Sequence, residues 1–136
     1  PRRVERIMTT SLLKHILLVE DEPDMQEITR LALENFGKFK VSVCSSGKET
    51  LEKVSAIMPD LIMLDMMMPE MDGLTTLKLL KENPKLSTIP VIFMTANAQT
   101  HEMKHYIDSG AVGAISKPFD PTKLADEIMA IWNTLI

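Results

Sequence analysis

The sequence predicts an α/β fold in which helices cover both faces of a parallel β-sheet. Three observations support this prediction. Five short apolar runs are bounded by turn residues, amphipathic stretches separate them, and the two patterns alternate along almost the whole chain. Strict alternation of strands and helices indicates right-handed βαβ crossovers and a parallel sheet. The length of 136 residues suits one domain with its own core.

The apolar runs are predicted to be strands that are buried on both faces. They are short and mostly aliphatic, which is typical of strands in a parallel sheet. In chain order they are HILLV (15–19), FKVSV (39–43), DLIML (60–64), PVIFM (90–94) and VGAIS (112–116).

Between these runs, apolar residues recur every three or four positions, which predicts amphipathic helices. Four buried faces are expected: Met25, Ile28, Ala32 and Phe36; Leu51, Val54 and Ile57; Leu74, Leu77 and Leu80; and Leu124, Ile128, Ile131 and Leu135. The stretch 98–109 is only weakly amphipathic, but its place in the alternation predicts a helix there as well. Gly37 and Gly110 are expected to end helices, and Asp120 and Pro121 to begin the last one.

Together these elements predict a single doubly wound (βα)5 domain at 14–136, after an extension at 1–13 that we expect to be loose. Two sheet orders are known for such chains, and the five-stranded, flavodoxin-like one runs 2-1-3-4-5. Alternation alone does not fix the order, but we predict this one. It makes strands 1 and 3 neighbours at the switch point, where such folds place their ligand site.

Composition argues against several classes of protein. The formal net charge of −4 disfavours direct binding to nucleic acid, which usually needs a basic surface. No apolar run approaches the roughly 20 residues of a membrane helix, so we expect no membrane insertion. Cys44 is the only cysteine and cannot form an internal disulfide, so the chemistry needs no oxidising compartment. We therefore expect a buried, unreactive thiol and a cytoplasmic location.

Polar residues follow four of the predicted strands. Glu20 and Asp21 follow the first, Asp65 the third, Thr95 the fourth and Lys117 the fifth. Because the carboxyl ends of parallel strands share one edge, these side chains are expected to converge. Like charges about 4 Å apart repel by roughly 4 kcal/mol at an effective dielectric near 20, so the three carboxylates favour a bound cation. All-oxygen ligands favour a hard cation, and a small number of protein ligands with several retained waters favours Mg²⁺ over Ca²⁺.

Other metal sites have little support. One cysteine and three histidines without ligand spacing disfavour structural zinc. Met66, Met67 and Met68 form a run with Met71 close by. A run in a loop after a strand is better explained by packing and backbone than by thioether ligands.

Four motifs, ILLVEDEPD, LIMLDMMMPEMDG, PVIFMTA and AISKPFDP, resemble those of the receiver domain of bacterial response regulators, such as the chemotaxis regulators. They follow one another in the family's order and fall on the expected elements. The resemblance covers about Lys14 to Leu135, nearly the whole chain.

The resemblance implies a role for each residue at the expected edge. Asp65 would accept a phosphoryl group, as an aspartyl phosphate, from a histidine kinase, a phosphotransfer protein or a small donor. Asp21 and Asp65 would bind Mg²⁺ together with the backbone carbonyl of Met67, and Glu20 would assist directly or through water. The metal and Lys117 would neutralise charge on the transferring oxygens.

The same resemblance assigns further residues to the phosphoryl group. Thr95 would donate a hydrogen bond to it and move towards it on activation. Backbone amides near Met66 and Ala96 would complete the cradle. A cis peptide bond before Pro118 would aim Lys117 into the site.

The chain departs from the family's pattern at two places. The first acidic pair, often two aspartates, is Glu20-Asp21 here, which keeps the charge. Ala114, three residues before Lys117, occupies a position where many receivers carry a Tyr or Phe that reports phosphorylation. Tyr106 is on the preceding helix and is expected to be a packing residue rather than a substitute.

These features predict a phosphorylation-activated signalling switch that acts on an unknown downstream protein, without an attached output domain and not as an enzyme on other substrates. It would be a monomer or a phosphorylation-dependent dimer. A phosphorelay intermediate is the first alternative. A phosphatase of the haloacid-dehalogenase type would need a second aspartate where the chain has Met67. A degenerate receiver that is never phosphorylated is disfavoured by Asp65, Thr95 and Lys117.

Overall fold

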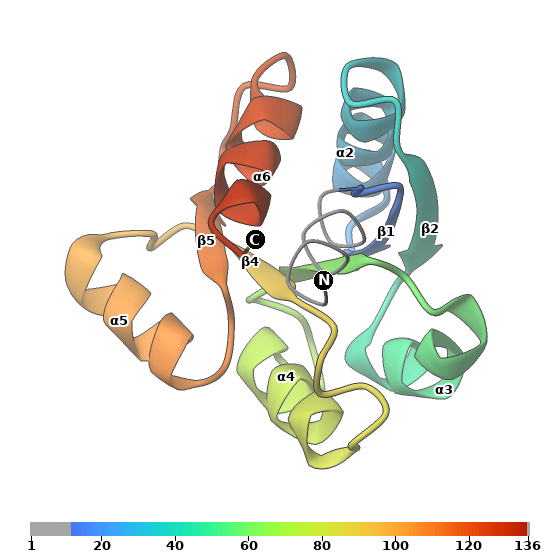
Figure 1. Ribbon diagram of the computed structural model, residues 1–136, viewed down its shortest axis with the longest axis vertical. Helices are drawn as coiled ribbons and strands as arrows, with labels where there is room; N and C mark the ends of the chain where they lie inside the picture. Colours follow the sequence, from blue (N-terminus) through green and yellow to red (C-terminus); the bar gives the residue numbers. More distant parts are fainter. Residues whose placement is uncertain (1–11, 136) are drawn as a thin grey trace, which may run out of the picture.

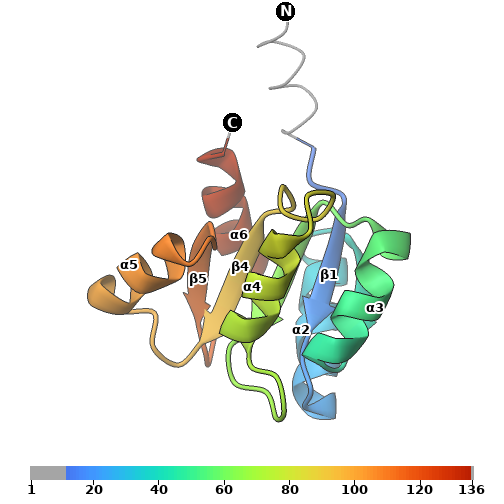
Figure 2. The ribbon, with the colours of Figure 1, turned by 90° about the horizontal axis from the view of Figure 1, so that it is seen from below.

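The computed structural model describes residues 12–135, which form one parallel five-stranded sheet between two layers of helices (Figures 1 and 2). The sheet order is β2-β1-β3-β4-β5, which confirms the predicted order. The strands are β1 (His15–Val19), β2 (Lys40–Cys44), β3 (Leu61–Asp65), β4 (Val91–Thr95) and β5 (Gly113–Ser116).

All five predicted strands exist, but four of them begin one residue later than predicted. Two of the residues that were predicted to begin a strand, Asp60 and Pro90, have features that fit the later start. The Asp60 carboxylate accepts hydrogen bonds from the amides of Lys14 and His15, so this side chain caps the start of β1. Pro90 has no amide hydrogen to donate to the sheet. Since β3 and β4 also end one residue later, Asp65 and Thr95 are the last residues of these strands.

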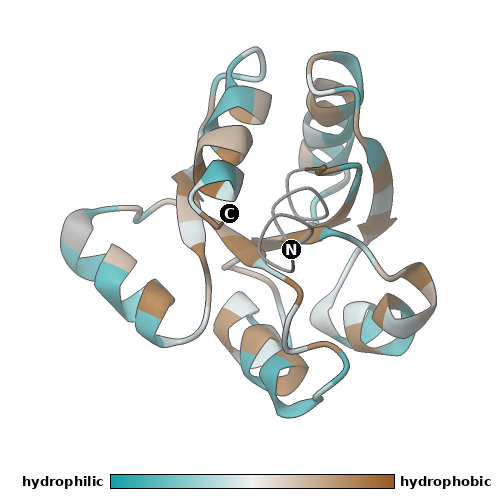
Figure 3. Cartoon of the chain, in the orientation of Figure 1, coloured by the Kyte–Doolittle hydropathy of each residue, from teal (hydrophilic) through white to brown (hydrophobic). Residues whose placement is uncertain are grey.

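The two faces of the sheet are covered by different helices. The helices are α2 (Pro23–Asn35), α3 (Gly47–Ile57), α4 (Gly73–Glu82), α5 (Thr100–Asp108) and α6 (Leu124–Asn133). In Figure 1, α2 and α6 lie above the sheet, and α3, α4 and α5 lie below it. The central strands β1, β3 and β4 are mostly apolar, whereas the edge strand β2 also carries polar residues (Figure 3). Apolar side chains of the helices pack against the sheet on both faces. Alternate strand residues therefore enter two cores, as Leu17 and Leu18 do.

The predicted buried face of the first helix is partly wrong, because Ala32 is buried and Met25 half-buried as predicted, but Ile28 and Phe36 are not. Ile28 and Phe36 are 46% and 57% exposed, whereas Thr29, Ala32 and Leu33 are buried. Both sets of residues recur at helical spacing and both contain apolar side chains. Spacing alone therefore did not show which set would be buried. The helix packs on the sheet through the set that contains Leu33.

The last helix begins later than predicted. α6 starts at Leu124, and residues 121–123 form a turn. The Asp120 carboxylate accepts hydrogen bonds from the amide and hydroxyl of Thr122, 2.9 and 2.7 Å away, so it caps this turn instead of the helix. Leu124, Ile128 and Trp132 are buried, and Leu135 is 36% exposed, so Leu135 lies outside the buried face.

Most of the predicted extension, 1–13, lies outside the described residues. Of its last two residues, Leu12 is exposed and Leu13 packs in the core between the sheet and the helices α2 and α6. Within residues 12–135, no helix combines the length and apolar character needed to cross a membrane.

Candidate functional site

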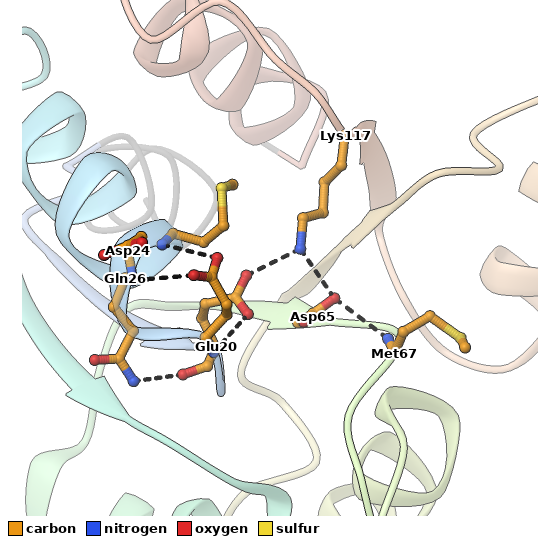
Figure 4. A network of polar contacts seen from close by, with 8 residues as sticks. Glu20, Asp24, Gln26, Asp65, Met67 and Lys117 are labelled. Carbon is orange, nitrogen blue, oxygen red and sulfur yellow. Dashed lines mark hydrogen bonds and ion pairs between the residues drawn. The ribbon is translucent and has the colours of Figure 1, made fainter.

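The polar residues singled out at the strand ends do meet at the carboxyl edge of the sheet. Glu20 and Asp21 follow β1, Asp65 ends the adjacent strand β3, and Lys117 follows β5. One carboxylate oxygen from each of Glu20, Asp21 and Asp65 lies within 4.8 Å of the other two. Figure 4 shows the Lys117 side chain reaching down to Glu20 and Asp65.

Lys117 bridges two buried carboxylates. Its Nζ lies 2.9 Å from Glu20 Oε1 and 3.4 Å from Asp65 Oδ1. The Glu20 and Asp65 side chains are 1% and 5% exposed, so water screens these charges poorly. The closer partner is Glu20, to which sequence analysis gave only an assisting role.

Burial and ion pairing shift the pKa values of Glu20 and Lys117 in opposite directions. Burial raises the pKa of the Glu20 carboxyl, and the hydrogen bonds from Lys117 and the Glu22 amide offset only part of this effect. Burial by itself would lower the pKa of Lys117, but Glu20 and Asp65 outweigh it, and the pKa of Lys117 is raised. Lys117 is therefore charged at neutral pH, while the ionised Glu20 carboxylate is costly to hold without a further cation.

The backbone after β3 holds Asp65 in place. The amide of Met67 donates to Asp65 Oδ1 at 3.2 Å. The amide of Gly73, at the start of α4, donates to the Met66 carbonyl at 2.9 Å. A Cβ atom at Gly73 would lie 2.7 Å from the Asp65 carbonyl oxygen, so only glycine allows α4 to begin this close to the strand.

The donor set fits a hard divalent cation. Three carboxylates with a formal charge of −3 face one lysine, and two of them are buried. Asp21 is half-buried and leaves one side open to solvent, which suits an ion that retains water ligands. Met66 and Met68 are buried in the core, and Met67 is 76% exposed, so the methionine run does not gather as a soft-metal site.

The structure shows which backbone amides face this site. The Met66 amide donates to the Met94 carbonyl within the sheet, whereas the next amide, that of Met67, points to Asp65. Ala96 follows β4 and is exposed. The Lys117-Pro118 peptide bond, for which the resemblance implies the cis form, is cis.

One contact at this edge was not predicted from the sequence. Thr95 is 4% exposed, and its Oγ1 accepts from the Asn97 amide at 3.1 Å and lies 3.4 Å from the Tyr106 hydroxyl. Tyr106 comes from α5, where only a packing role was expected. It does pack, edge to face on Phe93 with the ring centroids 5.4 Å apart, but its hydroxyl also reaches Thr95. The one available signal was a lone tyrosine on the helix that follows the Thr95 loop.

Comparison with known proteins places the chain in a family. The family model described as response regulator receiver domain matches residues 16–129. Response regulator Rre1 of Synechocystis is 36% identical over 121 residues, which are 89% of this chain and 51% of that protein. The chain thus spans about half the length of this relative. A 14.6 kDa protein from the sodA1 3′ region of Leptolyngbya boryana is also 36% identical, with 86% of this chain and 88% of that protein covered.

Solved structures agree with this assignment. The signal receiver domain of a signal transduction histidine kinase from Syntrophus aciditrophicus superposes with a TM-score of 0.76 and 34% identity, with 90% and 92% of the two chains covered. The chemotaxis protein CheY4 of Vibrio cholerae superposes with a TM-score of 0.80 over 88% and 99% of the chains, but at 22% identity it shows the shared fold alone. The chain belongs to the response regulator receiver domain family of two-component systems, in which phosphorylation carries the signal.

Proposed function

We propose that Asp65 accepts a phosphoryl group from a phosphohistidine on a sensor histidine kinase or a histidine phosphotransfer protein. One observation carries the proposal. The Asp65 carboxylate ends a central strand, is almost fully buried, and has Lys117 at 3.4 Å with two more carboxylates beside it. A purely structural role does not require such a concentration of charge, whereas phosphoryl transfer does.

In the proposed step, one Asp65 oxygen forms a bond to phosphorus while the bond between phosphorus and the histidine nitrogen breaks. The histidine keeps the electron pair of that bond and takes up a proton. Lys117 Nζ already bridges Asp65 and Glu20 and would turn to the phosphoryl oxygens, where negative charge is spread in the transition state. The Met67 amide beside Asp65 is the first candidate for the backbone cradle, together with the amide near Ala96.

Glu20, Asp21 and Asp65, with the backbone carbonyl of Met67, are proposed to hold Mg²⁺. When bound, the ion neutralises charge on the carboxylates and on the phosphoryl oxygens. Burial raises the pKa of the Glu20 carboxyl, so the ionised group is costly to keep without a nearby cation. This supports a metal at the site, where it would supply the missing positive charge. The contact of Glu20 with Lys117 also keeps that lysine extended towards Asp65.

The signal is proposed to leave by contact with a downstream protein, in the cytoplasm, after which water hydrolyses the aspartyl phosphate. A relay, in which the phosphoryl group passes on to a second histidine, is the alternative. The similarity to the receiver domain of a histidine kinase, at 34% identity, supports the relay as an alternative. The dehalogenase-type phosphatase has no such support, because exposed Met67 stands where its acid would be.

The test is labelling with radioactive acetyl phosphate in the presence of Mg²⁺. Wild type should take up acid-stable, base-labile label, as expected of an acyl phosphate, and Asp65→Asn should fold but lose it. Asp108→Asn, which changes an exposed aspartate on α5, is the matched control and should label as wild type does. Full labelling of Asp65→Asn, or none of wild type, would refute the assignment.

A further inference from the structure

Two features of α5 make Tyr106 stand out. Of the α5 side chains that the structure describes, only that of Tyr106 is buried, at 4% exposure. By contrast, the neighbouring α4 buries Gly73, Thr76, Leu77 and Leu80. α5 lies at the β5 end of its layer (Figures 1 and 2). The position of this helix therefore depends largely on one side chain.

That side chain ends in a closed set of hydrogen bonds. The Tyr106 hydroxyl donates to the Asn97 carbonyl at 2.9 Å, and the Asn97 amide donates to Thr95 Oγ1 at 3.1 Å. Because the single tyrosine proton is used on Asn97, the Thr95 hydroxyl is the donor in its 3.4 Å contact with Tyr106. Among the described residues, the Tyr106 oxygen is the only acceptor found for the Thr95 proton.

The hydrogen bond between Thr95 and Tyr106 is weak enough to be replaced by a stronger one. At 3.4 Å it is long for a bond between hydroxyls, whose usual distance is about 2.7–2.8 Å. A phosphoryl oxygen is a charged acceptor, and hydrogen bonds to charged groups are about twice as strong as neutral ones. Phosphorylation of Asp65 would thus draw the Thr95 proton from Tyr106 and loosen the hold of the loop on α5.

The packing explains why the helix supplies the aromatic ring. Ala114 on β5 is paired in register with Phe93 on β4, and both side chains face the core beneath α5. The alanine methyl leaves room next to Phe93, and the Tyr106 ring lies against Phe93 edge to face. The small side chain on the strand and the tyrosine on the helix thus complement each other.

We infer that Tyr106 is the residue that couples the state of Asp65 to the position of α5, through Thr95 and Asn97. This inference rests on the proposed phosphorylation of Asp65 and names how that site is read. In the resting state the Tyr106 hydroxyl holds the Thr95 proton and the loop after β4. When Thr95 turns to the phosphoryl group, Tyr106 keeps its bond to the Asn97 carbonyl but loses its contact with β4. α5 is then held less tightly, and the surfaces on both sides of the helix change. One of them is a groove of about 460 Å³ between α4 and α5, lined by Leu74, Lys81 and His105.

The test is a double-mutant cycle on the binding of beryllofluoride, a mimic of the phosphoryl group, with Mg²⁺. Tyr106→Phe keeps the ring and removes the hydroxyl that favours the resting state. It should tighten beryllofluoride binding by about 2- to 10-fold, as expected for one net hydrogen bond. In a Thr95→Val background, Tyr106→Phe should change the affinity by less than about 1.5-fold. Ser109→Ala removes a hydroxyl just after the end of α5, which donates only to the His105 carbonyl, and should match wild type.

A second readout is spectroscopic. Tyr106 is the only tyrosine in the chain, so its ring resonances report on this site alone. They should shift when beryllofluoride binds to wild type and stay in place in Thr95→Val, whereas a tyrosine that only packs would show no dependence on Thr95. Unchanged or weaker binding by Tyr106→Phe, or an equal gain in the Thr95→Val background, would overturn the inference and leave the proposed function standing. A folded wild type that binds no beryllofluoride would overturn both.

Discussion

The site at the carboxyl edge of the sheet has two halves that are built in different ways. The carboxylate half (Glu20, Asp21 and Asp65) sits at the ends of the neighbouring strands β1 and β3, in the centre of the sheet. The hydroxyl half (Thr95, Asn97 and Tyr106) joins β4 to its loop and to α5. The first half concentrates charge on a rigid frame, and the second is neutral and joined to a helix with one buried anchor. The comparison suggests that phosphoryl chemistry and signal output are divided between the two halves.

The largest expected effect breaks the carboxylate half. Three crowded carboxylates should make the metal-free fold less stable than the Mg²⁺ form. A cation that binds only the folded state stabilises it by about 2.7 kcal/mol at a hundredfold excess over its dissociation constant. Asp21→Ala should abolish most of this gain, as measured by chemical denaturation with Mg²⁺ and with EDTA.

Asp24→Ala serves as the control for that experiment. Asp24 is an exposed aspartate in the first turn of α2, just after the acidic pair, and it is not part of the carboxylate cluster. This variant should keep the full gain from Mg²⁺. Equal stability of wild type with Mg²⁺ and with EDTA would contradict the metal site.

The two halves also differ in how far the sequence predicts them. The carboxylate half follows from polar residues at the ends of apolar strands, because a parallel sheet brings these ends to one edge. The hydroxyl half depends on how α5 is turned, and a weakly amphipathic helix with one buried side chain carries little periodic signal. The Tyr106 hydroxyl contact was therefore not predicted, although the helix itself was.

The other errors have the same physical origin. α2 offers two sets of residues with helical spacing, and the structure buries the one with Leu33 instead of the one with Ile28 and Phe36. Asp120 followed by Pro121 fits a capped turn as well as the start of a helix, and here it forms the turn. Local pattern predicts which elements exist, but tertiary packing decides which of two equivalent faces or caps is used.

The second prediction sharpens the hydroxyl half. Beryllofluoride should change hydrogen exchange in residues 96–109 more than in residues 23–36, because α5 has one buried anchor while α2 is held by Thr29, Ala32 and Leu33. Thr95→Ala should weaken this response while leaving Mg²⁺ binding nearly intact, since Thr95 lies outside the carboxylate half. Losing one hydrogen bond to a charged group should weaken beryllofluoride binding by roughly tenfold or more.

The matched control for this prediction is Thr122→Ala, which removes an exposed hydroxyl that bonds only to Asp120. Its exchange response should equal that of wild type. Changes confined to the N-terminal half of the chain, or a full response in Thr95→Ala, would show that the signal does not pass through Thr95.

The smallest expected effect is on the pH dependence of stability, and it tests the Glu20 carboxyl alone. Burial raises the pKa of the Glu20 carboxyl above its ordinary value of 4.5, and Lys117 and the Glu22 amide offset part of the shift. The metal-free folded state thus binds this proton more tightly than the unfolded chain does. The resulting stability is present below pH 4.5 and is lost as the pH rises through the folded pKa. Lys117, whose pKa is raised from 10.5, loses its contribution only at alkaline pH, outside this window.

Glu20→Gln cannot ionise and escapes this loss. In EDTA, its unfolding free energy minus that of wild type should therefore increase between about pH 4.5 and 7. With saturating Mg²⁺ this increase should disappear, because a bound cation favours the ionised Glu20 and lowers its pKa in the folded state. The remaining pH dependence then has the opposite sign and lies below the ordinary value of 4.5. Glu52→Gln, which changes an exposed glutamate on α3, should show neither trend. If the Glu20→Gln difference did not depend on pH in either buffer, the Glu20 carboxylate would be relieved by Lys117 alone, and the carboxylate half would need no metal to be stable.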